Sequence, residues 1–214
     1  MGTSFWSDRR LVVRVVGPGR ERVVATNTPY ARIGSHERAE VVLSDAAIPR
    51  VGLYLHGTER GIFWVDLTAP STDAQPHSGW LHAGAVVRLG DYRISASFAE
   101  GEEPDADPGP PLDQKGSAGL PVPLLFVLVK DQRYATYHAY RSLTVVGRRE
   151  PSTFRIRSEL VSATHCALYW HDEQLWFIDL LSRNGTEKGG QRLDAGLVGL
   201  GKTIRLGGIK LGFA

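Results

Sequence analysis

The chain has a single cysteine, Cys166, among its 214 residues. One cysteine excludes an intrachain disulfide and is typical of a protein from a reducing compartment. No hydrophobic run approaches the ~20 residues that a membrane-crossing helix needs. Residues 1–7 contain neither the apolar core of a signal peptide nor an acylation motif. These absences predict a soluble, cytoplasmic protein with no membrane partner.

An excess of charge of one sign is also missing. Lys and Arg number 25 against 23 Asp and Glu, so the formal net charge is +2. The basic residues are scattered, without the sustained runs or interleaved aromatic residues that are typical of nucleic-acid-binding surfaces. The histidines have no metal-ligand spacing. We therefore expect no nucleic-acid partner, no metal and no cofactor.

Apolar residues are sparse in one internal segment, residues 100–122, which is rich in Pro, Gly and acidic side chains. Such a composition cannot bury a core, so it predicts a flexible linker. The hydrophobic fraction of the whole chain is 42%, which is ordinary for a globular protein. We expect two domains, residues 8–99 and residues 123–214, joined by this linker.

The two halves are related by an internal repeat. Matching positions follow one another in order at an offset of 113 residues, which rises to 117 near the end. An ordered series at a nearly constant offset indicates that both halves share one fold. The matches are Gly34 with Gly147, residues 61–67 with residues 174–180, and residues 88–90 with residues 205–207.

Short runs rich in β-branched and aromatic residues, bounded by Gly, Pro, Asn or Asp, recur along the chain. No segment keeps a helical period for three turns, so these runs predict strands. Many short strands separated by turns favour a sandwich of two antiparallel sheets. We therefore predict an all-β fold with one β-sandwich in each half. The clearest runs are residues 11–16, 124–130, 143–146, 167–170 and 175–180.

Three polar islands interrupt the strands of the second half. Arginine offers a planar fork of donors to phosphate oxygens, and a serine hydroxyl adds a neutral donor. An asparagine in a turn presents both a donor and an acceptor to a peptide backbone. The islands therefore contain the side chains that hold a phosphate and the peptide that carries it. They are Gly147-Arg148, residues 162–165 (Ser-Ala-Thr-His) and residues 182–186 (Ser-Arg-Asn-Gly-Thr).

The order and spacing of these islands resemble the forkhead-associated (FHA) domain, a β-sandwich that recognises phosphothreonine peptides. The family pattern is Gly-Arg, then Ser-Arg-x-His, then Ser/Thr-x-Asn-Gly, and the resemblance runs from about residue 124 to the end of the chain. It implies that Arg148 and Ser162 contact the phosphate. It also implies that Asn184 bonds the peptide backbone near the phosphothreonine.

The resemblance further implies supporting roles for neighbouring residues. Gly147 frees the arginine at the strand end, His165 braces the serine loop, and Gly185 permits the turn. Ala163 departs from the family pattern, because it stands where a basic or polar residue usually touches the phosphate. Arg183, in the variable turn position, is a hypothetical source of the positive charge that this departure removes.

A member of this family would act as an adaptor rather than an enzyme. The resemblance implies a phosphothreonine-containing protein as the partner and a Ser/Thr kinase pathway as the context. Taken singly, each island also has a plain explanation, since a Gly-Arg pair can be an ordinary turn and Asn-Gly is a standard hairpin signal. A phosphate-independent scaffold with a site that has decayed at Ala163 therefore stays open as the alternative.

The first half lacks the polar islands. At the repeat offset Ser35, Pro49 and Gly52 take the places of the arginine, the serine and the histidine, and Arg50 takes the place of alanine. The matching turn, residues 71–74, contains no Asn-Gly. A lone arginine cannot rebuild a phosphothreonine clamp. We predict an FHA-like scaffold without the site, which supports the second half or contacts a different protein.

Three patterns suggest catalysis but lack the context that catalysis needs. Residues 196–203 satisfy G-x-x-x-x-G-K-T, yet a phosphate loop requires a helix after it, and this segment is typical of a glycine turn between strands. Ser162, His165 and Asp179 lack a G-x-S-x-G elbow. Cys166 follows His165 directly, so in a strand their side chains point to opposite faces. The histidine therefore cannot activate the cysteine thiol. We predict a buried structural cysteine and no enzyme, and a nucleotide-dependent enzyme is the remaining rival hypothesis.

Overall fold

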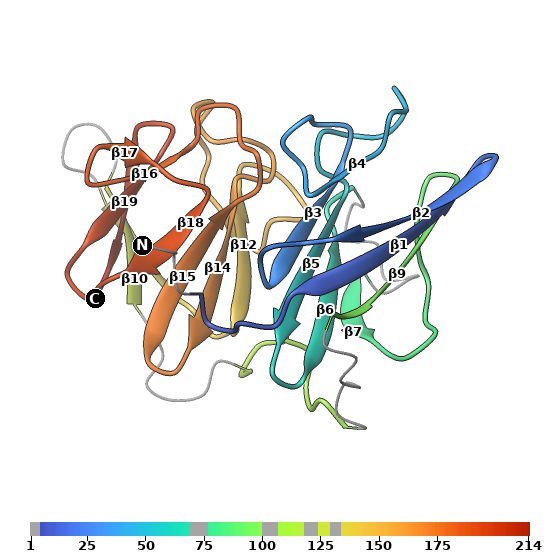
Figure 1. Cartoon of the computed structure of the whole chain (residues 1–214). Coiled ribbons are helices and arrows are strands. Elements are labelled where there is room, and N and C mark those ends of the chain that lie inside the picture. The colour runs from blue at the N-terminus through green and yellow to red at the C-terminus, as the bar shows by residue number, and fades with distance from the viewer. Residues whose placement is uncertain (1–4, 69–76, 100–106, 118–123, 129–133) are drawn as a thin grey trace. The chain divides into compact units, whose positions relative to one another are not determined.

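All regular structure in the described part of the chain is β-strand, which confirms the predicted all-β fold (Figure 1). The chain divides into two compact units, Met1–Pro111 (unit 1) and Leu112–Ala214 (unit 2). Within the described ranges no helix has the length and apolar character that a membrane crossing requires. The computed structural model describes residues 5–68, 77–99, 107–117, 124–128 and 134–214.

Unit 1 contains a four-stranded sheet of order β2-β1-β9-β8 and a five-stranded sheet of order β4-β3-β5-β6-β7. Neighbouring strands are antiparallel, except that β3 pairs with β4 in parallel. The strands are β1 (Leu11–Gly17), β2 (Arg20–Ala25), β3 (Tyr30–Gly34), β4 (Val41–Val42), β5 (Leu53–Thr58), β6 (Gly61–Asp66), β7 (Ser78–Leu81), β8 (Val87–Leu89) and β9 (Tyr92–Phe98).

Unit 2 contains a six-stranded sheet of order β11-β10-β20-β19-β16-β17 and a five-stranded sheet of order β13-β12-β14-β15-β18. Here too one pair, β12 with β13, is parallel. The strands are β10 (Leu124–Leu128), β11 (Tyr134–His138), β12 (Leu143–Gly147), β13 (Phe154–Arg155), β14 (Cys166–His171), β15 (Gln174–Asp179), β16 (Thr186–Lys188), β17 (Gln191–Arg192), β18 (Ala195–Val198), β19 (Thr203–Leu206) and β20 (Ile209–Phe213).

Each unit is a β-sandwich with one apolar core between its two sheets. In unit 2, Leu125 and Leu211 from the six-stranded sheet join the same buried cluster as Leu168 and Phe177 from the five-stranded sheet. The alternation of strand side chains explains the pattern, because every second residue of a strand points to the core. Burying each such side chain stabilises the fold by about 1.5–3 kcal/mol. A separate cluster fills unit 1.

The two units have the same strand order. The sheets β2-β1-β9-β8 and β4-β3-β5-β6-β7 correspond strand by strand to β11-β10-β20-β19 and β13-β12-β14-β15-β18, and unit 2 adds the hairpin β16–β17. Backbone hydrogen bonds between loops also recur at the offset of 113 residues. Examples are Ser35 N–H to Pro49 O with Arg148 N–H to Ser162 O, and His36 N–H to Arg50 O with Arg149 N–H to Ala163 O.

Part of the expected linker is described, and it bonds to the units. In unit 1 the Trp80 Nε1–H donates to Gly109 O at 2.9 Å. In unit 2 Leu112 is buried, with 1% of its surface exposed, and its carbonyl accepts a bond from Leu143 N–H at 2.8 Å. The other linker positions, residues 100–106 and 118–122, lie outside the described residues.

Candidate functional site

The three polar islands meet at one end of the unit 2 sandwich. Because β12, β14 and β15 are antiparallel neighbours, the end of β12, the start of β14 and the end of β15 lie at the same end of the sheet. Gly147 ends β12 and Arg148 follows it, the segment of residues 156–165 precedes β14, and the turn of residues 180–185 follows β15. Sequence positions nearly 40 residues apart are therefore brought together.

Arg148 is held where β12 leaves the sheet. Its backbone N–H donates to Ser162 O at 2.8 Å, and its Nε–H donates to Val161 O at 3.3 Å. Gly147 allows this approach, because a Cβ there would collide with the carbonyl oxygen of Ala163. The side chain is half-buried, and within the described residues the two terminal nitrogens of its guanidinium group have no partner.

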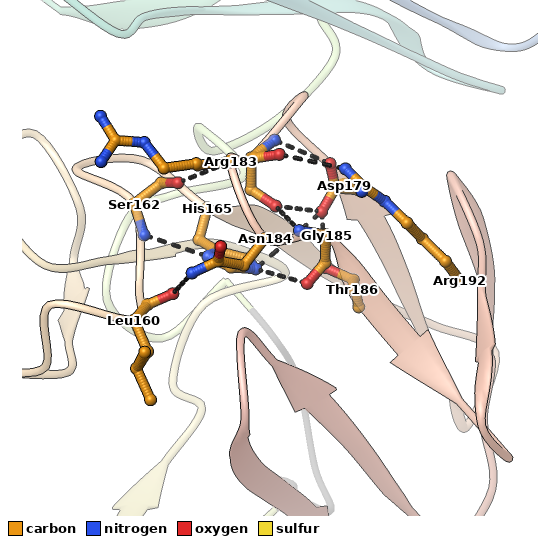
Figure 2. Close-up of polar contacts among 10 residues, drawn as sticks. Leu160, Ser162, His165, Asp179, Arg183, Asn184, Gly185, Thr186 and Arg192 are labelled. Atoms are coloured by element: carbon orange, nitrogen blue, oxygen red, sulfur yellow. Dashed lines mark hydrogen bonds and ion pairs between the residues drawn. The ribbon is translucent and has the colours of Figure 1, made fainter.

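His165 connects the serine loop to the asparagine turn. Its Nδ1 accepts a hydrogen bond from Ser162 N–H at 3.1 Å. The ring proton is then on Nε2, which donates to Gly185 O at 3.1 Å (Figure 2). Burial lowers the pKa of His165, although the nearby Asp179 carboxylate opposes the shift. Nε2 and Asp179 Oδ2 are 4.0 Å apart, but the acceptor role of Nδ1 requires the neutral ring, so this contact is no ion pair.

The turn that carries Asn184 is built around the buried carboxylate of Asp179. Its Oδ1 accepts from Ser182 N–H at 2.8 Å, and its Oδ2 accepts from the hydroxyls of Ser182 and Thr186, each at 2.7 Å. The Ser182 hydroxyl accepts in turn from Gly185 N–H at 3.0 Å. Gly185 has a φ of 79°, a left-handed conformation that glycine adopts without strain. The turn is therefore fixed by its own network.

Asn184 and Ser162 present polar groups at the surface of this network. The exposed Asn184 donates from Nδ2 to Leu160 O at 2.9 Å, which holds its amide beside the serine loop. The Ser162 Oγ accepts from Arg183 N–H at 3.0 Å. Since that bond uses a lone pair of the oxygen, the hydroxyl proton stays available for a further acceptor.

Sequence reasoning missed two residues that shape the site. The sequence pattern suggests Asp179 only as a catalytic candidate, whereas its carboxylate organises the turn. Arg192, on β17, donates from Nη2 to Ser182 O at 3.3 Å, and its guanidinium lies against Gly185. The hydroxyl residues Ser182 and Thr186 on either side of Asn-Gly were a signal for a buried acceptor. Nothing in the local sequence pointed to Arg192.

The patterns that suggested catalysis have structural roles. Residues 196–203 span β18, a glycine turn and the start of β19, and no helix follows them in the described chain. The His165 ring bonds the backbone N–H of Ser162 rather than its hydroxyl. Cys166 is fully buried in the core, and this burial raises the pKa of its thiol well above the usual value. Among the described residues no group of His, Cys, Asp and Glu side chains could hold a metal ion.

The matching end of unit 1 has two of the same backbone hydrogen bonds but different side chains. Ser35 and Pro49 occupy the frame positions of Arg148 and Ser162. Arg50 and Pro49 are both exposed. The turn at residues 71–74 lies outside the described residues.

Comparison with known proteins places this site inside a family match. The family model described as FHA domain matches residues 144–207, a stretch that includes every candidate residue from Gly147 to Gly185. No curated protein matches the chain.

Solved structures of FHA domains are similar to part of the chain. One, from work on phosphothreonine-dependent FHA domain interactions, is 24% identical, with 42% of this chain and 94% of that chain covered and a TM-score of 0.38. The FhaA FHA domain, complexed with the intracellular domain of Rv3910, is also 24% identical, with 42% and 99% covered and a TM-score of 0.38. The FHA domain of the CT664 protein from Chlamydia trachomatis is 20% identical, with 44% and 96% covered and a TM-score of 0.41. By the family model, residues 144–207 of unit 2 are similar to FHA domains.

Proposed function

We propose that unit 2 binds phosphothreonine-containing peptides through the loop end formed by Arg148, Ser162 and Asn184. The observation that supports this most strongly is the convergence of three donors on a preformed frame. The terminal guanidinium nitrogens of Arg148 have no partner among the described residues, the hydroxyl proton of Ser162 is available, and the side-chain amide of Asn184 is exposed. Hydrogen bonds of His165 and Asp179 already hold the loops that carry these donors. Peptide binding therefore loses little conformational entropy through ordering of these loops.

In this proposal each residue has a distinct role. Arg148 makes charge-assisted hydrogen bonds to the phosphate, each contributing about 1.5–3 kcal/mol. Ser162 donates a neutral hydrogen bond, which contributes about 1 kcal/mol. Asn184 bonds the peptide backbone, and Arg183 adds positive charge beside Ala163. Gly147, His165 and Gly185 support these groups.

The wider role that we propose is that of an adaptor without catalytic activity. Unit 2 would read the product of a Ser/Thr kinase and bring the phosphorylated partner to whatever unit 1 contacts. Unit 1 would be an FHA-like scaffold without a phosphothreonine site, since Ser35 and Pro49 offer no cation and no loop hydroxyl at the serine position. The proposed domains are residues 8–99 and residues 123–214.

Titration against degenerate peptide libraries tests the binding proposal. Libraries centred on phosphothreonine, phosphoserine and unmodified threonine would be compared with the wild-type chain and with Arg148→Ala. We expect phosphothreonine-selective binding that weakens roughly tenfold to a hundredfold in Arg148→Ala. Raising the salt concentration should weaken it as well, because ions screen charge-based recognition.

A different outcome would favour a phosphate-independent scaffold. The observation behind this alternative is Ala163, an exposed residue without a polar side chain at a position that usually supports phosphate binding. If wild-type binding to a cellular partner persists after phosphatase treatment and none of the libraries binds, the phosphothreonine proposal is wrong. Insensitivity of partner binding to Arg148→Ala would point to the same conclusion.

A further inference from the structure

The backbone N–H groups of three arginines are hydrogen-bonded to the dipeptide Ser162-Ala163. Arg148 N–H donates to Ser162 O at 2.8 Å, and Arg149 N–H donates to Ala163 O at 3.2 Å. Arg183 N–H donates to the Ser162 hydroxyl oxygen at 3.0 Å. The three arginines come from two different loops, yet the backbone N–H of each one donates a hydrogen bond to Ser162 or Ala163.

Two of these arginines have no assigned partner. Arg149 and Arg183 are exposed, and within the described residues neither guanidinium forms a hydrogen bond or an ion pair. Glu150, which follows Arg149 in the sequence, forms an ion pair with Arg155 at 3.2 Å. The loop end thus presents two exposed guanidinium groups that form no ion pair with an acidic side chain of the described residues.

The charge at this end exceeds that of one phosphothreonine. A phosphorylated threonine carries about −1.5 to −2 near neutral pH, whereas Arg148, Arg149 and Arg183 together carry three positive charges. Arg148 alone can form two parallel hydrogen bonds to a phosphate. Positive charges that lie close together repel one another, and a second negative group placed between them would relieve that repulsion.

We propose that Arg149 and Arg183 form a second anion subsite beside the phosphothreonine site, on either side of Ala163. The subsite takes a further negatively charged group of the same peptide, either a second phosphate or a carboxylate. Ala163 is exposed, and its methyl side chain occupies less space than the longer side chain of a basic residue would. In Figure 2 the Arg183 side chain extends on the Ser162 side of the turn, as this arrangement requires. The inference rests on the proposed function of unit 2.

The test compares singly and doubly charged peptides on the full chain. The parent is a phosphothreonine peptide selected from the libraries, and one series carries a phosphoserine at each flanking position from about −3 to +3 in turn. A parallel series carries glutamate at the same positions, which distinguishes a phosphate from a carboxylate. Fluorescence anisotropy at one fixed salt concentration would give each affinity. We expect at least one phosphoserine position to raise affinity roughly tenfold or more, and glutamate there to raise it less.

Matched variants show which arginines are responsible for the gain in affinity. Arg149→Gln should reduce it to less than about twofold, while affinity for the parent peptide changes by less than about threefold. Arg183→Gln should reduce the gain as far, and it should also weaken binding of the parent peptide, because Arg183 adds positive charge beside the phosphothreonine site. Arg149→Lys keeps the charge without the fork, so it should retain part of the gain. Arg205→Gln, which removes an exposed arginine from β19, should retain all of it. These side chains are exposed, and a thermal unfolding curve for each variant checks that it folds.

The outcomes separate this inference from the proposed function. If the parent peptide binds but no flanking charge strengthens binding, the second subsite does not exist and the phosphothreonine site stands. A gain that survives both Arg149→Gln and Arg183→Gln also overturns the subsite. If no peptide of any series binds, both proposals are wrong. As a further readout, the doubly phosphorylated peptide should lose affinity more steeply with salt than its parent.

Discussion

At the scale of single residues, His165 couples the two loops of the site through a neutral ring. Burial lowers its pKa below the ordinary value of 6.5, so the unfolded chain binds the proton more tightly than the folded chain. The free energy of unfolding should therefore fall as the pH drops through about 6.5 towards the lower pKa of the folded state. Urea unfolding at a series of pH values would measure this decline.

A direct check on His165 is its imidazole spectrum. Heteronuclear NMR should show the neutral ring with the proton on Nε2 at pH 7 and an apparent pKa below 6.5. His138 is exposed in the same unit, so His138→Gln should leave both the His165 titration and the decline in stability unchanged. An apparent pKa for His165 at or above its ordinary value would contradict the assigned hydrogen bonds.

Thr186 tests the buried network of the turn. Its side chain is fully buried and its hydroxyl donates to Asp179 Oδ2 at 2.7 Å. Thr186→Val keeps the shape but removes this donor to a buried carboxylate, which should lower the free energy of unfolding by about 1.5–3 kcal/mol. Thr136→Val, at an exposed position of β11, should change it by less than about 0.5 kcal/mol. Equal effects of the two changes in urea unfolding would argue against the network.

At the scale of elements, the close approach of β12 to the serine loop depends on Gly147. A Cβ there would collide with the Ala163 carbonyl oxygen, so Gly147→Ala should cost about 1–3 kcal/mol of stability and also weaken phosphopeptide binding. Gly34→Ala makes the same collision with Arg50 in unit 1, and it should destabilise the chain without affecting that binding. Gly79→Ala, where a Cβ would come no closer than 3.4 Å to any atom, should be tolerated.

The Gly34→Ala variant tests whether unit 1 takes part in phosphopeptide recognition. Loss of phosphopeptide binding in Gly34→Ala with unit 2 still folded would mean that unit 1 takes part in recognition. Isothermal titration with the selected peptide measures binding, and urea unfolding measures stability.

The longer apolar strands were predictable because their residues show strand character locally. The runs at residues 143–146 and 175–180 were expected from β-branched and aromatic content, and the structure has β12 (Leu143–Gly147) and β15 (Gln174–Asp179). The short hairpin β16–β17 was not predicted, since its few polar residues carry no strand pattern. Its register depends instead on β19, which pairs with β16.

The candidate site was predictable only in part. Its surface residues could be named because Gly-Arg, Ser-x-x-His and Asn-Gly are local patterns. The network beneath them could not, because Asp179 accepts hydroxyl protons and Arg192 contacts Gly185 only after the strands have paired. The attachment of Arg149 to Ala163 likewise joins residues that are distant in sequence.

At the scale of the whole molecule, two units share a strand order and a frame of loop hydrogen bonds, yet only unit 2 carries the candidate side chains. The full chain should therefore bind one phosphopeptide. Arg50→Ala, which removes the exposed arginine at the matching end of unit 1, should change affinity by less than about twofold. Calorimetric stoichiometry measures this, and a value of two peptides per chain would show that unit 1 has a site of its own.

The central claim is that phosphothreonine binds at the loop end of unit 2. The measurement that tests it most directly is a two-dimensional NMR titration of the isotope-labelled chain with the selected phosphothreonine peptide. The account predicts the largest shifts at the amides of Arg148, Ser162 and Arg183, with little change in unit 1 and none from the unphosphorylated peptide. Shifts that centre on another surface, or that appear equally without the phosphate, would contradict it.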